Sequence, residues 1–292
     1  MRPDKPVAIP IPVLVALALL GFAGNSLLCR AALAQGGRLI DAATFTSVRL
    51  GSGAFVLALL LLARGQRPRE GTFRSALALF AYAAGFSLAY VRIGAGIGAL
   101  ILFGCVQTTM LTAGLIRGER PGSLGAIGMA IAFSGLLLLA APGASAPDPI
   151  GAAMMATAGI AWGVYSLRGR QATNPLAATA DNFIRTLPLT FGLSLVGYFV
   201  LEKPHASAKG LGLAMASGAL ASGVGYSLWY AALPQLTAMR AAIVQLLVPV
   251  LAALGSVVLL GESLNSRIAI AGLLLIGGVL LAIRKPTKKQ ES

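Results

Sequence analysis

The chain repeats itself once, with a period of about 140 residues. Residues 21–30 (GFAGNSLLCR) are echoed by residues 159–168 (GIAWGVYSLR), and residues 85–90 (GFSLAY) by residues 225–230 (GYSLWY). Each half holds five apolar runs long enough to cross a bilayer. Because five is an odd number, the second copy would lie upside down in the membrane relative to the first. Inverted repeats of this kind place a binding site between the two halves.

Shorter features repeat in the same order. Arg49 is echoed by Arg185, and the pair Gly118-Glu119 by Gly261-Glu262. We therefore expect two units, a first five-helix repeat over residues 1–143 and a second, inverted one over residues 144–292.

The composition restricts the chain to a membrane. Hydrophobic residues make up 57% of it and charged residues 11%, with a mean hydropathy of +0.83, whereas a soluble domain carries roughly 25% charged residues. The expected fold is an all-α integral membrane protein, with ten transmembrane helices arranged as two inverted five-helix repeats around a central cavity. The predicted spans are 10–33, 41–63, 73–92, 95–116, 123–141, 149–170, 177–200, 208–231, 238–260 and 265–283.

The charge gives the orientation. The net charge is +14, which in a soluble protein would suggest nucleic acid, but the basic residues sit mainly in short connections. With the N-terminus inside, fourteen Lys and Arg residues fall on the cytoplasmic side and five on the other. The positive-inside rule thus predicts that both termini are cytoplasmic. We expect a lipid bilayer and no nucleic acid as partner.

Several kinds of chemistry are excluded. Cys29 and Cys105 lie inside apolar runs, and His205 is the only histidine, so neither a disulfide framework nor a metal site is indicated. An enzyme would need a nucleophile with a base, or a metal cluster, and the spans offer neither. We expect no catalytic residue and no cofactor.

Four arginines fall within apolar runs, and each must pair, face water or reach the interface. Arg30 lies near the end of its span. Arg185 follows Asp181 by four residues, which predicts an ion pair within one helix. Arg49 has no acid at helical spacing and needs a partner from another helix or from the substrate. The fourth is Arg240.

Three further residues are expected to act in gating or structure. Glu119 and Glu262 close the fourth and ninth spans after a glycine, on opposite membrane faces. Each is either an interfacial cap or a gate contact. Pro249 in the ninth span frees the backbone carbonyl of Gln245 and can bend the helix.

Polar and aromatic residues gather near span centres, where repeat transporters place their sites. Asn25, Tyr82, Phe86, Gln107, Trp162, Tyr165 and Gln245 share this depth. Trp229, Tyr226 and Tyr90 lie nearer span ends, where aromatic residues commonly form interface belts. Helix packing would account for any one central residue, but the set favours a cavity that takes an organic solute. No Asp or Glu lies near a span centre, so a cationic substrate lacks an obvious counter-charge.

The duplicated unit ending in Gly-Glu, with PVLAALG at 249–255 before Gly261-Glu262, resembles the EamA-type branch of the drug/metabolite transporter superfamily. Tyr82, Trp162 and Trp229 look similar to positions in its YddG-type amino-acid exporters. The resemblance implies a ten-helix basket in the bacterial inner membrane, with these three residues lining its cavity. The fourth span departs from the pattern at 104–109 (GCVQTT), which leaves smaller amino acids open as substrates.

The leading hypothesis is a secondary exporter of amino acids, aromatic or small and neutral such as threonine and methionine, that works by alternating access. Trp162, Tyr82, Phe86, Tyr165 and Trp229 would form the walls, while Asn25, Gln107 and Gln245 orient the substrate. The alternative is a transporter of the same fold for a nucleotide sugar, a lipid-linked sugar or a drug cation. A fused duplication removes the need for a partner half, so the chain could work as a monomer.

Overall fold

The computed structural model describes residues 9–33, 38–93, 95–140, 148–201, 203–260 and 266–283. Over these residues every extended regular element is a helix, and the only strand-like contact is an isolated bridge between Ile40 and Ala206. The all-helical fold class expected from the sequence is therefore confirmed.

The described helices follow the ten predicted spans. Those of the first half are α1 (Ile11–Leu33), α2 (Ala42–Ala63), α3 (Phe73–Tyr90), α4 (Ala95–Ile116) and α5 (Ser123–Ala140). Those of the second half are α6 (Pro149–Gly169), α7 (Pro175–Val196) with the π-helix η1 (Gly197–Leu201), α8 (Ala208–Ala216), the π-helix η2 (Ser217–Val224), α9 (Gly225–Ala232) with η3 (Leu233–Gln235), α10 (Ala238–Gln245), α11 (Leu247–Leu260) and α12 (Ser266–Ile283).

The helix starts are fixed by short polar side chains in the connections. Asp41 accepts a hydrogen bond from the Thr44 N–H, and Thr72 accepts one from the Ser75 N–H. Asp148 and Asn174 do the same for α6 and α7, each followed by a proline at the first helical position. Such caps satisfy amide groups that have no partner within the helix, and proline there loses no hydrogen bond.

Three predicted spans are not continuous α-helices. The seventh ends in the π-helix η1 (Gly197–Leu201). The eighth contains the π-helix η2, whose wider turn changes which side chains face inward after Ser217. The ninth is interrupted at Leu246, between α10 and α11. The proline at 249 has no N–H to donate to the carbonyl of Gln245, so the break lies where the sequence predicted a bend.

Within the described residues, five helical segments are long and apolar enough to cross a membrane: Ile11–Leu33, Ala42–Ala63, Pro149–Gly169, Ala208–Gln235 and Ala238–Leu259. Ile101–Ile116, Ser123–Leu138 and Ala269–Ile283 are apolar but shorter. Helices α3 and α7 are in neither group. Both pack against α2 and against each other, so protein contacts cover part of their surface.

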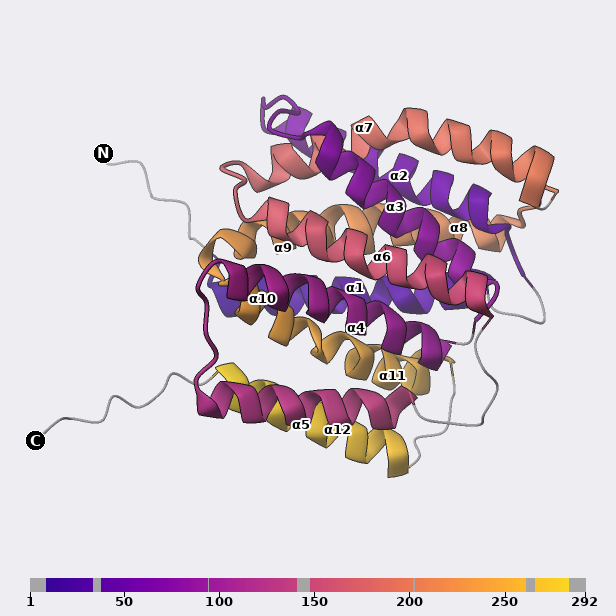
Figure 1. Cartoon of the computed structure of the whole chain (residues 1–292). Coiled ribbons are helices and arrows are strands. Elements are labelled where there is room, and N and C mark those ends of the chain that lie inside the picture. Colours follow the sequence, from indigo (N-terminus) through magenta and orange to yellow (C-terminus); the bar gives the residue numbers. More distant parts are fainter. Residues whose placement is uncertain are drawn as a thin grey trace, which may run out of the picture.

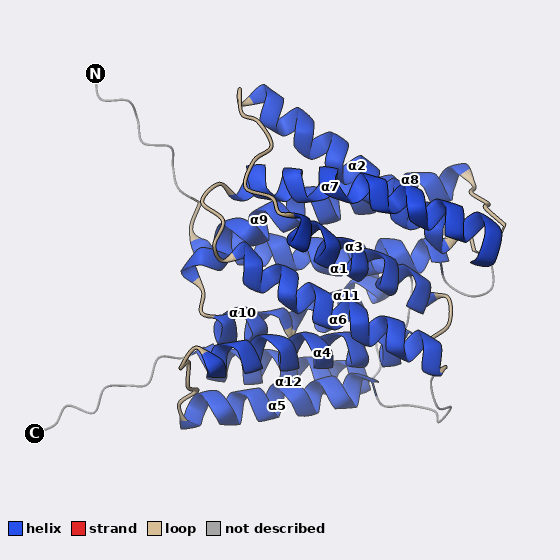
Figure 2. Cartoon of the chain, turned by 45° about the horizontal axis from the view of Figure 1, so that its top comes forward, coloured by secondary structure: helices blue, strands red, loops and turns tan. Residues whose placement is uncertain are grey.

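The main helix contacts of one half have counterparts in the other half. α5 pairs with its counterpart α12, and α2 with its counterpart α7, along opposite sides of the bundle (Figure 1). α3 and α4 of the first half pack on α6, just as α9 and α11 of the second half pack on α1. Figure 2 shows the same two outer pairs, with α1 and α6 running between them. This is the packing that two inverted five-helix repeats produce.

Contacts between connections agree with ten crossings. The α2–α3 connection contacts the α6–α7 connection through Glu70 and Thr173, and the α4–α5 connection contacts the start of α10 through Glu119. Asp41 contacts His205, and Arg92 contacts Asp148. In every one of these pairs, the ten-span topology places both connections on the same membrane face.

The outer surface of the molecule is apolar, and several polar side chains are buried within its largely hydrophobic interior. Large hydrophobic side chains are exposed around its perimeter, including Phe55, Phe191 and Phe199, while Asn25, Arg49, Gln107, Ser222 and Gln245 are buried. A soluble protein would have the opposite arrangement. The exposed apolar surface is what a helical protein presents to lipid.

Candidate functional site

A small cavity lies where helices from both halves meet. It has a volume of about 20 Å³, which is room for about one water molecule. Its lining comes from α1, α3, α4, α6, α10 and α11. The lining residues are Phe22, Ser26, Tyr82, Phe86, Leu102, Phe103, Trp162, Gln245 and Val248. Tyr82, Phe86, Trp162 and Gln245 were predicted from their depth in the sequence.

Aromatic rings enclose the cavity. Phe22 packs edge-on against Trp162, Tyr226 and Trp229, with ring centroids 5.1, 5.6 and 5.6 Å away. The ring centroid of Trp162 also lies 4.8 Å from that of Tyr82 and 4.7 Å from that of Tyr226. Offset and edge-on aromatic pairs of this kind stabilise a rigid wall. Phe22 was missed in the sequence, although it lies one helical turn before Asn25 and so shares its face.

Gln245 holds the Trp162 ring in place. The indole N–H of Trp162 donates to the Gln245 Oε1 at 2.6 Å, and the Gln245 amide donates to the Ala241 carbonyl at 3.0 Å. Gln107 is buried but does not line the cavity. Its amide donates to the Ala242 carbonyl at 2.8 Å and so ties α4 to α10.

Tyr165 and Trp229, also predicted as walls, lie behind the rings that line the cavity. Trp229 is fully buried, donates to the Ser166 hydroxyl at 3.1 Å and packs on Phe22. Tyr165 is fully buried, with its ring 5.7 Å from Trp162 and 4.8 Å from Tyr230.

The polar centre of the site is Arg49 on α2. Its side chain has no solvent exposure. The Nε donates to the Ser222 hydroxyl at 2.9 Å, and the Nη2 donates to the Tyr226 hydroxyl at 2.6 Å. The Nη1 has no hydrogen-bond partner. The guanidinium stacks 5.3 Å from the Tyr82 ring centroid and 5.9 Å from that of Phe86, so the aromatic wall lies against the cation.

Asn25 completes this network from α1. Its Oδ1 accepts from the Ser217 hydroxyl at 2.7 Å and from the Ser222 hydroxyl at 3.4 Å, and its Nδ2 donates to the Tyr82 hydroxyl at 3.4 Å. Both serines lie on the π-helix η2, which depth counting along an α-helix could not reveal. The same irregular turn precedes Tyr226, which the sequence placed nearer a span end.

A close helix contact brings η2 to Arg49. A Cβ on Gly218 would lie only 2.0 Å from the Arg49 carbonyl oxygen, and one on Gly53 would overlap the Phe183 ring. Glycines at the crossing let the two backbones approach closely. The serines of η2 are thus within reach of the α2 arginine.

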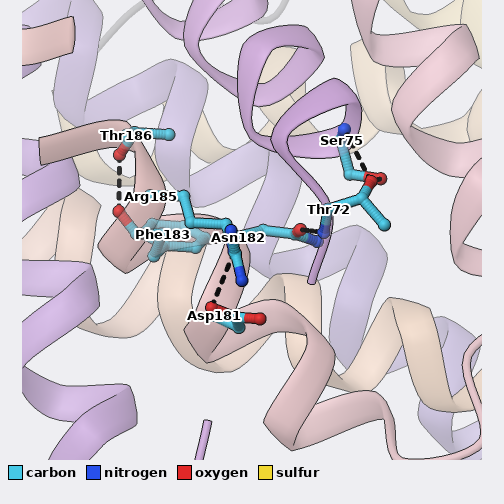
Figure 3. A network of polar contacts seen from close by, with 7 residues as sticks. All are labelled: Thr72, Ser75, Asp181, Asn182, Phe183, Arg185 and Thr186. Atoms are coloured by element: carbon cyan, nitrogen blue, oxygen red, sulfur yellow. Dashed lines mark hydrogen bonds and ion pairs between the residues drawn. The ribbon is translucent and has the colours of Figure 1, made fainter. Parts of the chain in front are cut away.

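Arg185 and Asp181 form the predicted ion pair within α7. The Arg185 Nε lies 2.9 Å from the Asp181 Oδ1. Figure 3 shows this pair beside the start of α3, where the Thr72 N–H donates to the Asn182 Oδ1 at 3.1 Å. Neither charged residue lines the central cavity.

Glu119 links three elements at one end of the bundle. Its carboxylate accepts from the Ala238 and Met239 N–H groups at 2.9 Å each and lies 3.5 Å from the Arg170 Nη1. Partial burial alone would raise the pKa of Glu119, but the two backbone N–H groups and the Arg170 charge hold this pKa below its usual value. Glu262, the repeat counterpart of Glu119, lies outside the described residues.

No cluster of three His, Cys, Asp or Glu side chains that could hold a metal occurs in the part of the chain that the structure describes. Cys29 is buried and free, and Cys105 is half-buried and free.

The fold and its buried polar centre define a helical multi-pass membrane protein with a site between two halves. Residues 149–284 match the sequence profile of the EamA-like transporter family. The chain belongs to this family, and it is a membrane transporter of the drug/metabolite type.

Two further proteins are similar to this chain over most of its length. An uncharacterised protein of Pseudomonas aeruginosa, PA1977, is 52% identical over 273 residues, which cover 93% of each chain. A solved crystal structure, described only as that of a protein, covers 91% of this chain and 98% of its own, with a TM-score of 0.74 and 21% identity. At that identity the likeness shows the fold alone.

Proposed function

We propose that this chain is a secondary transporter in the bacterial inner membrane, with both termini in the cytoplasm, that exports amino acids and related small metabolites by alternating access. The observation that carries the proposal is the central cavity, which aromatic and polar side chains from both repeats enclose. A transporter whose halves rock around a fixed site needs such an arrangement.

The contacts at the two ends of the bundle support alternating access. On the face assigned to the cytoplasm, Glu119 bonds the start of α10, and Glu70 bonds Thr173 and Asn174. On the opposite face, Asp41 accepts from the His205 N–H. The cavity of about 20 Å³ is smaller than an amino acid, so substrate entry requires one set of these contacts to open.

The chemistry of the site favours a small organic solute over the other cargoes. A drug cation would find no acidic side chain among the described residues that line the cavity, and the positive charge of Arg49 lies just behind the Tyr82 and Phe86 rings. Most nucleotide sugars carry two phosphates, whereas Arg49 is the one charged group among the described residues of the buried network around Tyr82. An aromatic wall with a few orienting amides and hydroxyls suits amino-acid side chains.

The test is counterflow into proteoliposomes. Vesicles preloaded with threonine, methionine or phenylalanine should accumulate the labelled amino acid faster than protein-free vesicles. Trp162→Ala removes one wall and should lower the rate about tenfold or more, since a lost stacking surface of about 1.4 kcal/mol is a factor of ten. No accumulation of any amino acid by the wild-type protein would refute the proposal.

Phe191→Ala is the matched control, because Phe191 is an aromatic residue of α7 that is 67% exposed on the outer surface. Its rate should stay near that of the wild type. An equal loss in both variants would mean that the Trp162 effect is not specific to the cavity.

A further inference from the structure

Arg49 is a buried cation, and no acidic side chain lies beside it in the described parts of the chain. Among the described residues, its guanidinium donates hydrogen bonds to the Ser222 and Tyr226 hydroxyl groups and lies against the Tyr82 and Phe86 rings, and its Nη1 has no hydrogen-bond partner. An ionised group inside a membrane protein is costly unless it is paired, and such groups commonly mark substrate pathways. The missing partner is therefore informative.

No acidic side chain within the described residues can serve as that partner. The chain has nine Asp and Glu residues, and five of them are described: Asp41, Glu70, Glu119, Asp148 and Asp181. The first four lie in connections or cap helix starts, and the fifth pairs with Arg185. The central site therefore carries a net positive charge.

A chain of hydrogen bonds links the Arg49 cation to the cavity through Tyr226 and Tyr82. An arginine can only donate, so the Tyr226 oxygen accepts from Arg49 and its own proton points to the Tyr82 oxygen, 3.3 Å away. Tyr82 also accepts from Asn25. Its hydroxyl proton has no acceptor among the contacts of the described residues, and Tyr82 lines the cavity.

We propose that this site recognises its substrate as a carboxylate monoanion, and that the substrate's ammonium group is not required for binding. The inference rests on the proposed function, because it assigns a charge to the substrate of the same cavity. The Tyr82 hydroxyl donates to the carboxylate, and Arg49 acts as a positioning residue that polarises this donor through Tyr226. Hydrogen bonds in which one partner is ionised are roughly twice as strong as neutral ones.

The proposal separates two groups that an amino acid always carries together. A carboxylate meets a polarised hydroxyl backed by a cation, whereas an ammonium would meet the same cation with no carboxylate to offset it. The uncharged acceptors near the cavity, Asn25 Oδ1 and Gln245 Oε1, are already occupied by serine and indole donors. Removing the ammonium should therefore cost little affinity, and removing the carboxylate should weaken binding at least about tenfold.

The experiment uses compounds that differ in one group at a time. Phenylalanine has both charges, 3-phenylpropanoate has only the carboxylate, and phenethylamine has only the ammonium. Methionine, 4-(methylthio)butanoate and 3-(methylthio)propylamine form a second trio with a flexible side chain. Calorimetry on the purified full chain in detergent at pH 7 gives the affinities, and competition with counterflow of the labelled amino acid tests whether they bind the transport site.

We expect each carboxylate to bind at least as tightly as its parent amino acid, and each amine to bind at least about tenfold more weakly, the factor expected for one charged hydrogen bond. Equal or tighter binding of the amines would overturn the inference. If the wild type transports amino acids but shows no such preference, the inference fails and the proposed function stands. If none of the compounds is bound or transported, the proposed function fails as well.

Variants separate a charge effect from a structural one. Arg49→Lys keeps the cation and should retain the preference for the carboxylate, whereas Arg49→Gln should abolish it. Tyr82→Phe keeps the ring and removes the proposed donor, so it should lower carboxylate affinity about tenfold or more even if Arg49→Gln does not fold. Arg185→Gln is the control, since it removes an arginine outside the cavity, and it should leave the preference unchanged. An unchanged preference in Tyr82→Phe would refute the assigned donor.

Discussion

Arg49 on α2 and Arg185 on α7 are counterparts in the repeat, yet their surroundings differ completely. Arg185 has a side chain that is 46% exposed and pairs with Asp181 four residues earlier in its own helix. Arg49 is fully buried, and its hydrogen-bond partners, Ser222 and Tyr226, lie more than 170 residues away in the sequence. One arginine is satisfied locally, while the other depends on the opposite half of the molecule.

This difference has an energetic meaning. A partly exposed ion pair contributes only about 0.2–1 kcal/mol to stability. The Arg185–Asp181 pair is therefore a modest structural contact. A buried arginine without a carboxylate costs several kcal/mol. A duplication that kept arginine in both halves and left only one of them unpaired points to a function at Arg49. Mutation can give Arg49 an acidic partner or remove the partner of Arg185, and so test this difference.

The largest effect is expected when Arg49 is given the partner it lacks. Ser222→Asp places a carboxylate next to the Arg49 Nε, which lies 2.9 Å from the present hydroxyl. The resulting internal ion pair neutralises the site, and we expect amino-acid counterflow in proteoliposomes to fall more than tenfold, because the Tyr82 donor to the substrate is no longer polarised by an unpaired cation.

Ser222→Asn is the matched control, since it has a similar volume and no charge, and it should retain substantially more activity than Ser222→Asp. Equal losses in the two variants would attribute the effect to packing, and unchanged counterflow in Ser222→Asp would show that a free cation at Arg49 is not needed.

An intermediate effect is expected for the ion pair of Arg170. This third arginine lies in the second half and pairs with a carboxylate of the first half. Its carboxylate partner Glu119 also caps α10 through two backbone N–H groups. Glu119→Gln keeps the size of the side chain but removes the charge, and it should lower the free energy of unfolding by about 1 kcal/mol at pH 7.

The pH dependence of unfolding checks the same contact. Because the pKa of Glu119 is lowered in the folded chain, its contribution is complete above the unfolded value near 4.3 and disappears as the pH falls through the folded pKa. Chemical denaturation in detergent should show wild type and Glu119→Gln converging in acid. A gap between them that stays constant below pH 4 would contradict this role.

The sequence predicts most of this architecture for a simple reason. Apolar runs, capping residues such as Asp148, and the Asp181–Arg185 spacing are local features, and the helices and the ion pair follow from them. The central network is not local. The π-helix η2 turns Ser217 and Ser222 towards Asn25 and Arg49, and no α-helical depth count anticipates that. Tyr226 was discounted for the same reason, because it follows this irregular turn and acts through contacts with distant helices. Phe22 was missed although its spacing to Asn25 on α1 was a local signal.

The smallest effect should come from breaking the local pair. Asp181→Asn leaves Arg185 half-exposed to solvent, so its charge stays hydrated, and the free energy of unfolding should fall by no more than about 0.5 kcal/mol. Arg185→Gln should cost a similar amount. The double variant should cost little more than either single one, as a double-mutant cycle of one weak pair requires. Counterflow should remain near wild type in all three variants, since neither residue lines the cavity. A loss of transport comparable to that in Ser222→Asp would show that the two arginines act alike, and the contrast between a structural arginine and one that positions the substrate's hydrogen-bond donor would no longer hold.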